Sequence, residues 1–326
     1  MTSLKGYLLI SLDFELFWGV RDVKTKSSYK ENLINVHKVI PRLLELADQY
    51  DVKLTFATVG FLFAKNKEEL LHFAPKVKPT YNNSIFNPYY YIENTEDLDN
   101  YSSFHFAYNL IDLIKSNKNH ELATHTFSHF YVNEEGQNVD QFEADLLAAI
   151  NIAKRRNISF NSIVFPRNQI NKNYLKICKK HGITNYRGTE KHWMFDTSDT
   201  KKLERPFNKL FRLADAYVNL SGYNTYPLTK INSINSVKNI PSSKFFRPYI
   251  KSLKALESLR IKRIRKGLTH AAKNKEVYHI WWHPHNFGTN TEENFRNLES
   301  IFKHYQTLKR DYNFNCATMS ELAEKI

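Results

Sequence analysis

Cysteine is scarce in this chain of 326 residues. Only Cys178 and Cys316 occur, and no CxxC pair is present. This excludes a disulfide framework and favours a reducing compartment. Glycine and proline are also modest, at 9 and 10 residues, while Phe and Tyr are abundant at 23 and 19. The composition therefore indicates a packed globular protein and argues against a disordered or fibrous chain.

Long hydrophobic runs are missing as well. No window of about eighteen apolar residues exists, so the sequence predicts no membrane span. Near the N-terminus, the apolar run 7–12 is short and ends on the carboxylate Asp13, whereas a secretory signal has a longer apolar region and a small-residue cleavage site. We therefore expect a cytoplasmic protein.

Positive charge is in excess, with a formal net charge of +14. Such an excess suits nucleic acid, an anionic membrane surface or an acidic substrate. The basic residues are densest in 244–275, where we predict a long basic helix or helix pair over 243–274. Ile261, Ile264 and Leu268 recur there at helical spacing, so one stripe faces a core and the charges coat the outside. We expect no nucleic-acid partner, and weak contact of 244–275 with an anionic membrane as a hypothesis.

Strand-like segments alternate with helical patterns about seven times along the chain. This rhythm predicts an α/β architecture with parallel strands. We expect a single domain over 1–326, with irregular insertions at about 76–103 and 188–240. The predicted strands are 6–13, 52–59, 120–124, 162–165, 184–187, 276–282 and 314–317. The predicted helices are 30–49, 104–118, 140–156, 171–181, 205–217, 243–274, 291–309 and 320–325.

Polar clusters follow four of the predicted strands at their carboxyl ends. In parallel α/β folds the loops at this edge carry the functional site. One cluster contains His125 and His129. On a turn of helix, residues at i and i+4 share one face with Cβ atoms about 5–6 Å apart, and two neutral imidazoles held in this way can bind one divalent cation.

Asp13 and Glu15 supply two carboxylates at the end of the first strand. Residues at i and i+2 of a strand point to the same side, so both carboxylates can reach one centre. One would complete a set of two histidines and one carboxylate around a metal, and the other would stay off the metal as a base for an activated water. The spacing leaves open which carboxylate takes which role.

Two further clusters complete the predicted site. Arg167 and Asn168 follow the strand 162–165, where an arginine can orient a carboxylate through a bidentate pair. On the strand 276–282, Trp281 and His283 share one face, and a histidine at the end of a strand suits a general acid that protonates a leaving amine. His285 competes with His283 for this role.

Together these motifs resemble the polysaccharide deacetylases, the enzymes of carbohydrate esterase family four. The resemblance rests on Asp-Phe-Glu at 13–15, Thr-Phe and Gly60 on the second strand, His-Thr-Phe-Ser-His at 125–129, an arginine after the next strand, and a late strand ending in histidine. It covers about residues 7–320. The wording Phe-Pro-Arg-Asn-Gln at 165–169 and Trp-His-Pro-His-Asn-Phe-Gly at 282–288 is most similar to a branch associated with O-antigen or capsule gene clusters.

This resemblance implies a distorted (β/α)7 barrel and a role for each motif residue. Asp13 would be the general base, oriented by Arg167, and His283 the catalytic acid. The implied metal ligands are Glu15, His125 and His129, and the implied cofactor is a divalent metal, with zinc ahead of cobalt, nickel or manganese. Additional contacts to substrate or to these residues are expected from Trp18, Asn168, Trp281 and His285. The usual adjacent Asp-Asp is here Asp-Phe-Glu, and the arginine motif departs from the commoner Arg-Pro-Pro-Tyr.

The resemblance implies hydrolysis of an N-acyl group, N-acetyl in first place, on an amino sugar of a surface polysaccharide or of its nucleotide- or lipid-linked precursor. One alternative is a deformylase acting on an activated sugar, for which an anionic substrate would use the positive charge. Another is a barrel that has lost catalysis and serves as a binding or assembly partner in polysaccharide synthesis, because a fold alone does not give a function.

Overall fold

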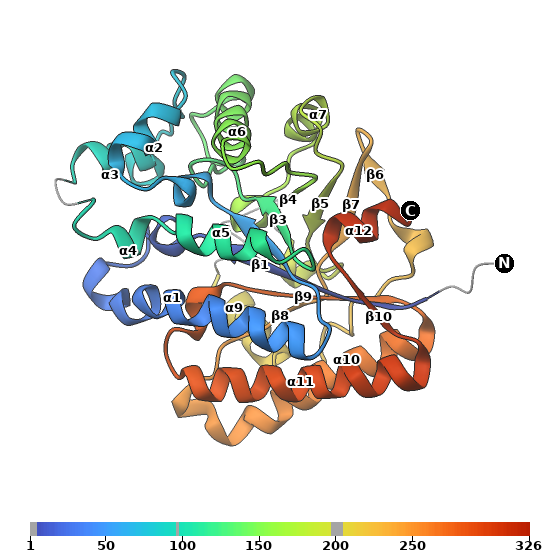
Figure 1. Cartoon of the computed structure of the whole chain (residues 1–326). Helices are drawn as coiled ribbons and strands as arrows, with labels where there is room; N and C mark the ends of the chain where they lie inside the picture. Colours follow the sequence, from blue (N-terminus) through green and yellow to red (C-terminus); the bar gives the residue numbers. More distant parts are fainter. Residues whose placement is uncertain (1–4, 96–97, 197–204) are drawn as a thin grey trace.

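Strand β1 (Tyr7–Phe14) lies inside the sheet, with strands on both sides, in the computed structural model of the chain, which describes residues 5–95, 98–196 and 205–326 (Figure 1). All eight of its residues are buried. β9 pairs in parallel with one side of it, while β10 and β2 share the other side, β10 beside Tyr7–Leu9 and β2 beside Ser11–Phe14. A strand enclosed in this way is apolar along most of its length, which is how it reads in the sequence.

The described strands form one ten-stranded sheet in the order β6-β7-β5-β4-β3-β2-β1-β9-β8, with β10 beside β1. All pairs are parallel except β6 with β7. The remaining strands are β2 (Thr55–Thr58), β3 (Glu121–Thr124), β4 (Ser162–Ile163), β5 (Asn185–Gly188), β6 (Ser233–Ile234), β7 (Val237–Pro241), β8 (Lys244–Phe245), β9 (Val277–Trp282) and β10 (Asn315–Ala317).

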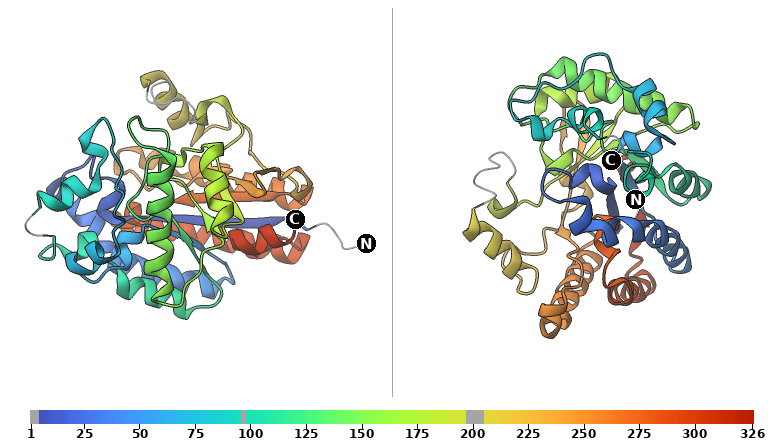
Figure 2. Two further views of the ribbon diagram at one scale, coloured as in Figure 1. Left: turned by 90° about the horizontal axis from the view of Figure 1, so that it is seen from above. Right: turned by 90° about the vertical axis from the view of Figure 1, so that its left-hand side faces the viewer.

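A short stretch of chain joins the two ends of this curled sheet. β7 pairs with β5 and β8 pairs with β9, and only Ser242 and Ser243 lie between β7 and β8. The Ser242 amide donates to the carbonyl of Gly188, and the Ser243 amide to that of His279. We call residues 237–246 the seam segment. The sheet is therefore curled into a distorted barrel, and the predicted fold class is confirmed (Figure 2).

Helices surround the outside of the barrel (Figure 2). They are α1 (Lys26–Gln49), α2 (Lys67–Phe73), α3 (Pro88–Glu93), α4 (Ser102–His105), α5 (Tyr108–Ser116), α6 (Val139–Lys154), α7 (Lys172–Lys180), α9 (Pro206–Asp215), α10 (Glu257–Asn274), α11 (Thr291–Tyr312) and α12 (Met319–Glu324). Among the described residues, no helix is long and apolar enough to cross a membrane.

The alternation of side chains along β1 creates two layers. Leu8, Ile10, Leu12 and Phe14 belong to the large core that the outer helices cover. Tyr7 and Leu9 point the other way, into a smaller apolar cluster that includes Met319 and Leu322 of α12. The apolar cluster fills the amino-terminal end of the barrel interior, so the next inward positions, Ser11 and Asp13, lie at the carboxyl end of the strands, where the site was predicted.

All seven predicted strands are present, with shifted ends, but the prediction of one basic helical stretch over 243–274 is wrong in its first part. That part contains β8 and a 3-10 segment (Lys251–Leu256), and α10 begins only at Glu257. The backbone of Phe246 donates to the carbonyl of Trp281, so sheet pairing overrides the helical pattern. Lys244, Arg260 and Arg263 are buried, so the charges of this segment do not all coat the outside.

Candidate metal centre and catalytic site

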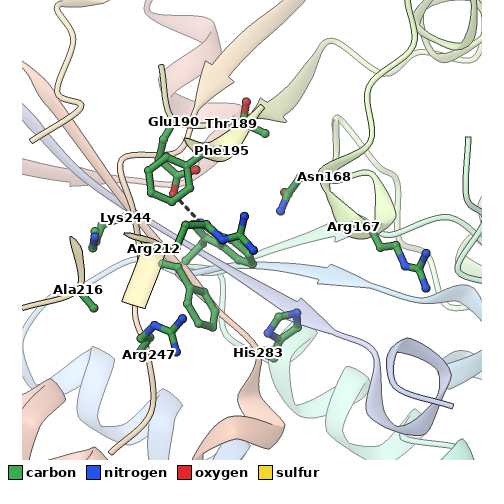
Figure 3. A pocket seen from close by; sticks show the side chains of 12 residues that line it. Arg167, Asn168, Thr189, Glu190, Phe195, Arg212, Ala216, Lys244, Arg247 and His283 are labelled. Carbon is green, nitrogen blue, oxygen red and sulfur yellow. Dashed lines mark hydrogen bonds between the residues drawn. The ribbon is translucent and has the colours of Figure 1, made fainter. Parts of the chain in front are cut away.

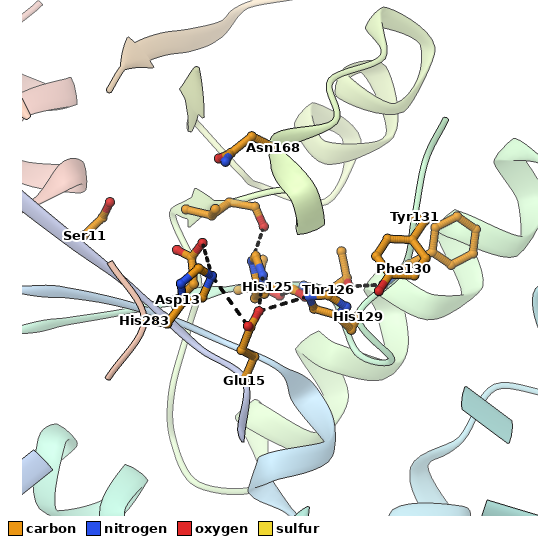
Figure 4. A network of polar contacts seen from close by, with 12 residues as sticks. Ser11, Asp13, Glu15, His125, Thr126, His129, Phe130, Tyr131, Asn168 and His283 are labelled. Carbon is orange, nitrogen blue, oxygen red and sulfur yellow. Dashed lines mark hydrogen bonds and ion pairs between the residues drawn. The ribbon is translucent and has the colours of Figure 1, made fainter. Parts of the chain in front are cut away.

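Glu15, His125 and His129 converge on one point at the carboxyl end of the barrel (Figure 4). The Oε2 atom of Glu15 lies 3.4 Å from Nε2 of His125 and 3.1 Å from Nε2 of His129. All three side chains are buried, each at most 5% exposed. Glu15 follows β1 and the two histidines follow β3, and β2 lies between these two strands. The carboxyl ends of β1 and β3 therefore bring these residues together.

The two histidines do not lie on a helix turn, and that part of the spacing argument is wrong. They belong to an irregular loop in which Thr126 has φ 64° and His129 has φ 59°. Asp145 of α6 holds this loop: its carboxylate accepts hydrogen bonds from the amides of Phe127 and Ser128 and from the Ser128 hydroxyl. The Thr126 hydroxyl also accepts from the amide of Phe130, at 2.7 Å. The loop thus sets the position of both imidazoles.

The hydrogen bond at Nδ1 of His125 suits a cation between these side chains. Its Nδ1 lies 2.7 Å from the carbonyl oxygen of Val164, which can only accept, so Nδ1 carries a proton. In the neutral ring Nε2 is then an acceptor that faces another acceptor, the carboxylate oxygen of Glu15. Nδ1 of His129 is buried and has no hydrogen-bond partner among the described residues. A divalent cation bound by both Nε2 atoms and Glu15 would remove the conflict between acceptors.

Asp13 is held by an arginine that the sequence interpretation did not select. Both carboxylate oxygens accept from Arg187 of β5, at 2.6 and 2.7 Å. Arg187 also donates to Ser11 Oγ at 3.0 Å and to Asn168 Oδ1 at 2.8 Å, and its guanidinium lies 4.3 Å from the ring centre of Trp281. Burial raises the pKa of Asp13, but Arg187, together with the nearby histidines, outweighs burial and holds this pKa below its usual value.

Arg167, predicted to orient Asp13, lies elsewhere. Its guanidinium pairs with Asp22 and with Glu134, the latter at 3.1 Å, and lies 4.3 Å from the ring centre of Tyr131. The backbone explains the difference, because Arg167 has φ 55° in a short turn after β4, whereas Arg187 projects from within a strand. The orienting role therefore falls to Arg187, with Asn168 as its neighbour.

His283 and His285 occupy different environments. Nε2 of His283 lies 3.5 Å from Glu15 Oε1 and 3.8 Å from Asp13 Oδ2, and its side chain is 23% exposed. His285 is buried and stacks against His283, with ring centres 5.0 Å apart. Burial, followed by the effect of His283, lowers the pKa of His285 to about 3, so this imidazole is neutral at pH 7. Of the two, only His283 faces the open cleft, which favours it as the acid.

Glu15 is shared by a second set of metal-ligating groups. Glu15, His283 and His285 also have ligand atoms within 4.8 Å of one another. The set with His125 and His129 suits a metal ion better, because all three of its groups are buried, whereas His283 lines the cleft. Because the two sets share Glu15, His283 lies next to the three residues that could hold the metal ion.

The remaining predicted residues divide into two groups. Trp281 and Asn168 line a cleft that opens beside His283 (Figure 3). Trp18, predicted as a contact for the substrate or for the site residues, has no exposed surface: it packs against Phe61 and Tyr91, and its Nε1 donates to the carbonyl of His105. Trp18 therefore cannot contact a substrate.

Two residues of the site were missed in the sequence although each left a signal. Arg187 is a cation at the end of the buried strand 184–187, and a charge on such a strand needs an acidic partner. Asp145 lies on α6 among the apolar positions Phe142, Leu146 and Ala149, where a carboxylate is out of place unless it accepts hydrogen bonds. In both cases the sequence indicates a buried charge that needs a hydrogen-bonding partner, but it does not indicate which residue that partner is.

Comparisons with known proteins were made by sequence and by structure. No protein-family model matches the sequence, and no curated protein matches it. Among solved structures, a protein described as a polysaccharide deacetylase from Mycobacterium smegmatis matches with a TM-score of 0.59 and 13% identity, covering 100% of this chain and 92% of the other. One from Pseudomonas aeruginosa PAO1 matches at 0.51 and 10% identity, with coverages of 98% and 89%.

An allantoinase matches almost as well, with a TM-score of 0.51, 9% identity and coverages of 98% and 88%. At such identities the matches show the fold. The chain therefore has the distorted barrel of the polysaccharide deacetylases. Because a protein named as an allantoinase shares this barrel, the fold does not identify the substrate, and the function has to be argued from the site.

Proposed function

We propose that this protein is a metal-dependent hydrolase that removes an N-acyl group from an amino sugar. The observation that carries the proposal is the meeting of three groups at one strand edge: a buried Glu-His-His set, a carboxylate held by Arg187, and a histidine that faces a cleft. A divalent ion, zinc in first place, bound to Glu15, His125 and His129 would supply an activated water and polarise the acyl carbonyl.

Asp13 is the proposed base. Arg187 keeps it ionised and fixes both of its oxygens, so it can accept a proton from the attacking water without changing its orientation. His283 is the proposed acid, since its Nε2 lies near both Glu15 and Asp13 and its ring reaches the cleft, where the leaving amine would depart. The two groups thus divide proton removal and proton delivery between them.

The cleft beside His283 suits a sugar ring. Trp281 and Phe245 lie there with ring centres 4.7 Å apart, and aromatic faces are common platforms for the apolar face of a sugar. We further propose that the substrate belongs to a surface polysaccharide, of the O-antigen or capsule type, or to its nucleotide- or lipid-linked precursor. The acyl group is N-acetyl in this proposal, and release of formate in place of acetate would identify a deformylase.

Replacing a histidine of the metal set tests the proposal directly. We expect His125→Ala and His129→Ala to lose both bound metal and acetate release from an N-acetylated amino-sugar substrate. The exposed His72 on α2 gives a matched control, His72→Ala, which should keep both. Metal content by elemental analysis and acetate release are measured on the same preparations. Full activity with unchanged metal in His125→Ala would contradict the metal assignment, and bound metal with no acyl release from any amino sugar would favour the inactive barrel.

A further inference from the structure

The cleft beside the metal centre is unusually rich in cations. It has a volume of about 220 Å³ and is lined by Arg167, Arg212, Lys244 and Arg247, and Glu190 is the one carboxylate among the lining residues that the structure describes. Figure 3 shows Arg247 and Arg167 on opposite sides of the view, with His283 between them. The cleft therefore begins at the proposed acid and extends to a cationic wall that deacylation itself does not require.

Internal partners engage three of these four charges, since Arg212 donates to the carbonyl of Met194 at 3.4 Å. Arg167 pairs with Asp22 and Glu134, and Lys244 pairs with Asp215. Glu190 is engaged as well, because its Oε1 accepts from Nε1 of Trp281 at 3.3 Å. These groups are occupied in holding the walls of the cleft, so they offer little to a ligand.

Arg247 differs from them. In the described part of the chain no hydrogen bond or ion pair joins its guanidinium to a carboxylate, although the side chain is only partly exposed. Its backbone is fixed by the seam segment that precedes it and by Arg260, which donates to its carbonyl. Burial lowers the pKa of Arg247, and the described side chains that act on this pKa are Tyr217, Arg212 and Arg260, of which none is a carboxylate. A partly desolvated guanidinium without an acid is a site that an anion would stabilise.

The spacing along the cleft indicates where that anion belongs on the substrate. His283 marks the position of the reacting amide, and the rings of Trp281 and Phe245 follow it as an aromatic floor. Arg247 comes two residues after Phe245, directly after the seam segment. A sugar ring on the aromatic floor would thus carry its N-acyl group toward His283 and its other end toward Arg247. Arginine forms a planar fork that matches the oxygens of a phosphate in a bidentate way.

We propose that the cleft selects an amino sugar that carries a phosphate or diphosphate group, with Arg247 as the residue that binds this phosphate. This inference rests on the proposed function for the sugar, but the anion site itself does not depend on catalysis. The same phosphate chemistry occurs in nucleotide-linked and in lipid-linked sugars. A lipid-linked sugar is included in the test because α9, which supplies Arg212, carries two exposed apolar side chains that a lipid could contact. These are Phe207 and Leu210, at 63% and 62% exposure.

Binding of inorganic pyrophosphate to the metal-loaded protein, measured by calorimetry, tests the anion site without any reaction. We expect Arg247→Gln to weaken binding about tenfold to a hundredfold, and Arg247→Lys to weaken it less. Lys251→Gln removes the same charge from an exposed position four residues away and should bind as the unmodified protein does. If Arg247→Gln bound pyrophosphate as tightly as the unmodified protein, the proposal would be overturned. A thermal unfolding curve for the variant serves as the control that it is folded.

Kinetics then connect the site to the substrate. The four substrates are an N-acetylated amino-sugar 1-phosphate, its nucleoside-diphosphate and polyprenyl-diphosphate derivatives, and a neutral N-acetylated tetrasaccharide. We expect Arg247→Gln to raise KM about tenfold or more for the phosphate-bearing substrates only. The preferred derivative identifies the source of the phosphate.

The possible failures are distinct. Best activity on the neutral tetrasaccharide, unaffected by Arg247→Gln, would overturn the phosphate proposal and leave the deacylase standing. Pyrophosphate binding that depends on Arg247, without acyl release from any of the four substrates, would support the anion site and contradict the proposed function.

Discussion

Two buried carboxylates, Asp13 and Asp215, meet the same kind of partner in different parts of the molecule. Asp13 is 3% exposed and Asp215 has no exposed surface. Burial raises the pKa of each, and neighbouring cations outweigh burial, so that the pKa of each lies below its usual value. By burial, charge and ionisation alone the two could not be told apart.

Their remaining hydrogen bonds separate them. Asp215 accepts from Arg263 at 2.8 Å, from Lys244, and from the amides of Leu220 and Ser221, so both of its oxygens are committed to holding a loop and two basic side chains. Asp13 has Arg187 on one side and His283 at 3.8 Å, at the wall of the cleft, on the other. The pair at Asp215 is therefore structural, whereas Asp13 keeps the contact with the cleft that its proposed role as the base requires.

The largest effect is expected where the pair is structural. Asp215→Ala leaves the buried cations Lys244 and Arg263 without their acid, and removal of one partner from a buried pair costs about 3–5 kcal/mol. Urea denaturation should show this loss of unfolding free energy. The exposed pair of Arg42 and Glu292 gives a control, since Arg42→Gln should cost about 1 kcal/mol or less. If Asp215→Ala lost no more unfolding free energy than this control, the pair at Asp215 would not be the structural counterpart of the pair at Asp13.

A loss of activity with little loss of metal is expected where the pair is catalytic. Arg187→Gln should lower kcat about a hundredfold, because Asp13 loses both of its fixed contacts, while the metal content stays the same. Arg167→Gln, which interrupts contacts to Asp22 and Glu134 instead, should lower kcat less. If Arg167→Gln were the more damaging of the two, Arg167 would be the residue that supports the base.

The pH dependence of kcat/KM gives a second test of the contact between Arg187 and Asp13. The base acts in its ionised form, so activity is lost as pH falls through the pKa of Asp13 in the folded protein. Burial raises that pKa and Arg187 is the strongest of the groups that lower it. Removing Arg187 therefore raises the pKa, and the acid limb of kcat/KM should move to higher pH in Arg187→Gln. An acid limb that stays in place would show that this limb does not report Asp13.

The smallest effect is expected from Asp145, a third buried carboxylate, which acts on the site only through the loop 125–129. Asp145→Asn places an amide donor among the donors of Phe127 and Ser128 and should weaken metal binding about tenfold to a hundredfold. Asp140→Asn changes an exposed carboxylate at the start of the same helix and should leave metal affinity unchanged. Metal titration against a competing chelator measures both. Unchanged affinity in Asp145→Asn would show that the loop holds its shape without this carboxylate.

The sequence predicts the fold well where elements are long and their pattern is strong. The buried apolar run of β1 and the amphipathic pattern of α6 are found at the predicted places. β7, with the sequence Val-Lys-Asn-Ile-Pro, was not predicted, because Asn and Pro are typical of turns and because its pairing with β5 bridges about fifty residues. Such a strand is set by its partners and by closure of the barrel, which no local window contains.

The site shows the same division. Asp13, Glu15, His125, His129 and His283 were selected from short motifs at strand ends, and the structure brings these five together. Arg187 was missed because a motif after one strand suggested Arg167, and the two arginines differ in three-dimensional reach, which local sequence does not encode. The helix-turn argument for the histidines failed although the pair itself converges, because a loop with two positive φ angles replaces the helix turn.

The seam segment has one further consequence. It joins β5 to β9 in a few residues, and its far end delivers Phe245 and then Arg247 to the cleft, whereas the residues of the metal set come from the opposite strands β1 and β3. An insertion or deletion just after residue 246 would shift Arg247, the proposed phosphate ligand, and leave the proposed metal ligands where they are. A change in this one short segment would therefore alter the proposed selectivity for phosphate-bearing substrates without altering the proposed hydrolytic site.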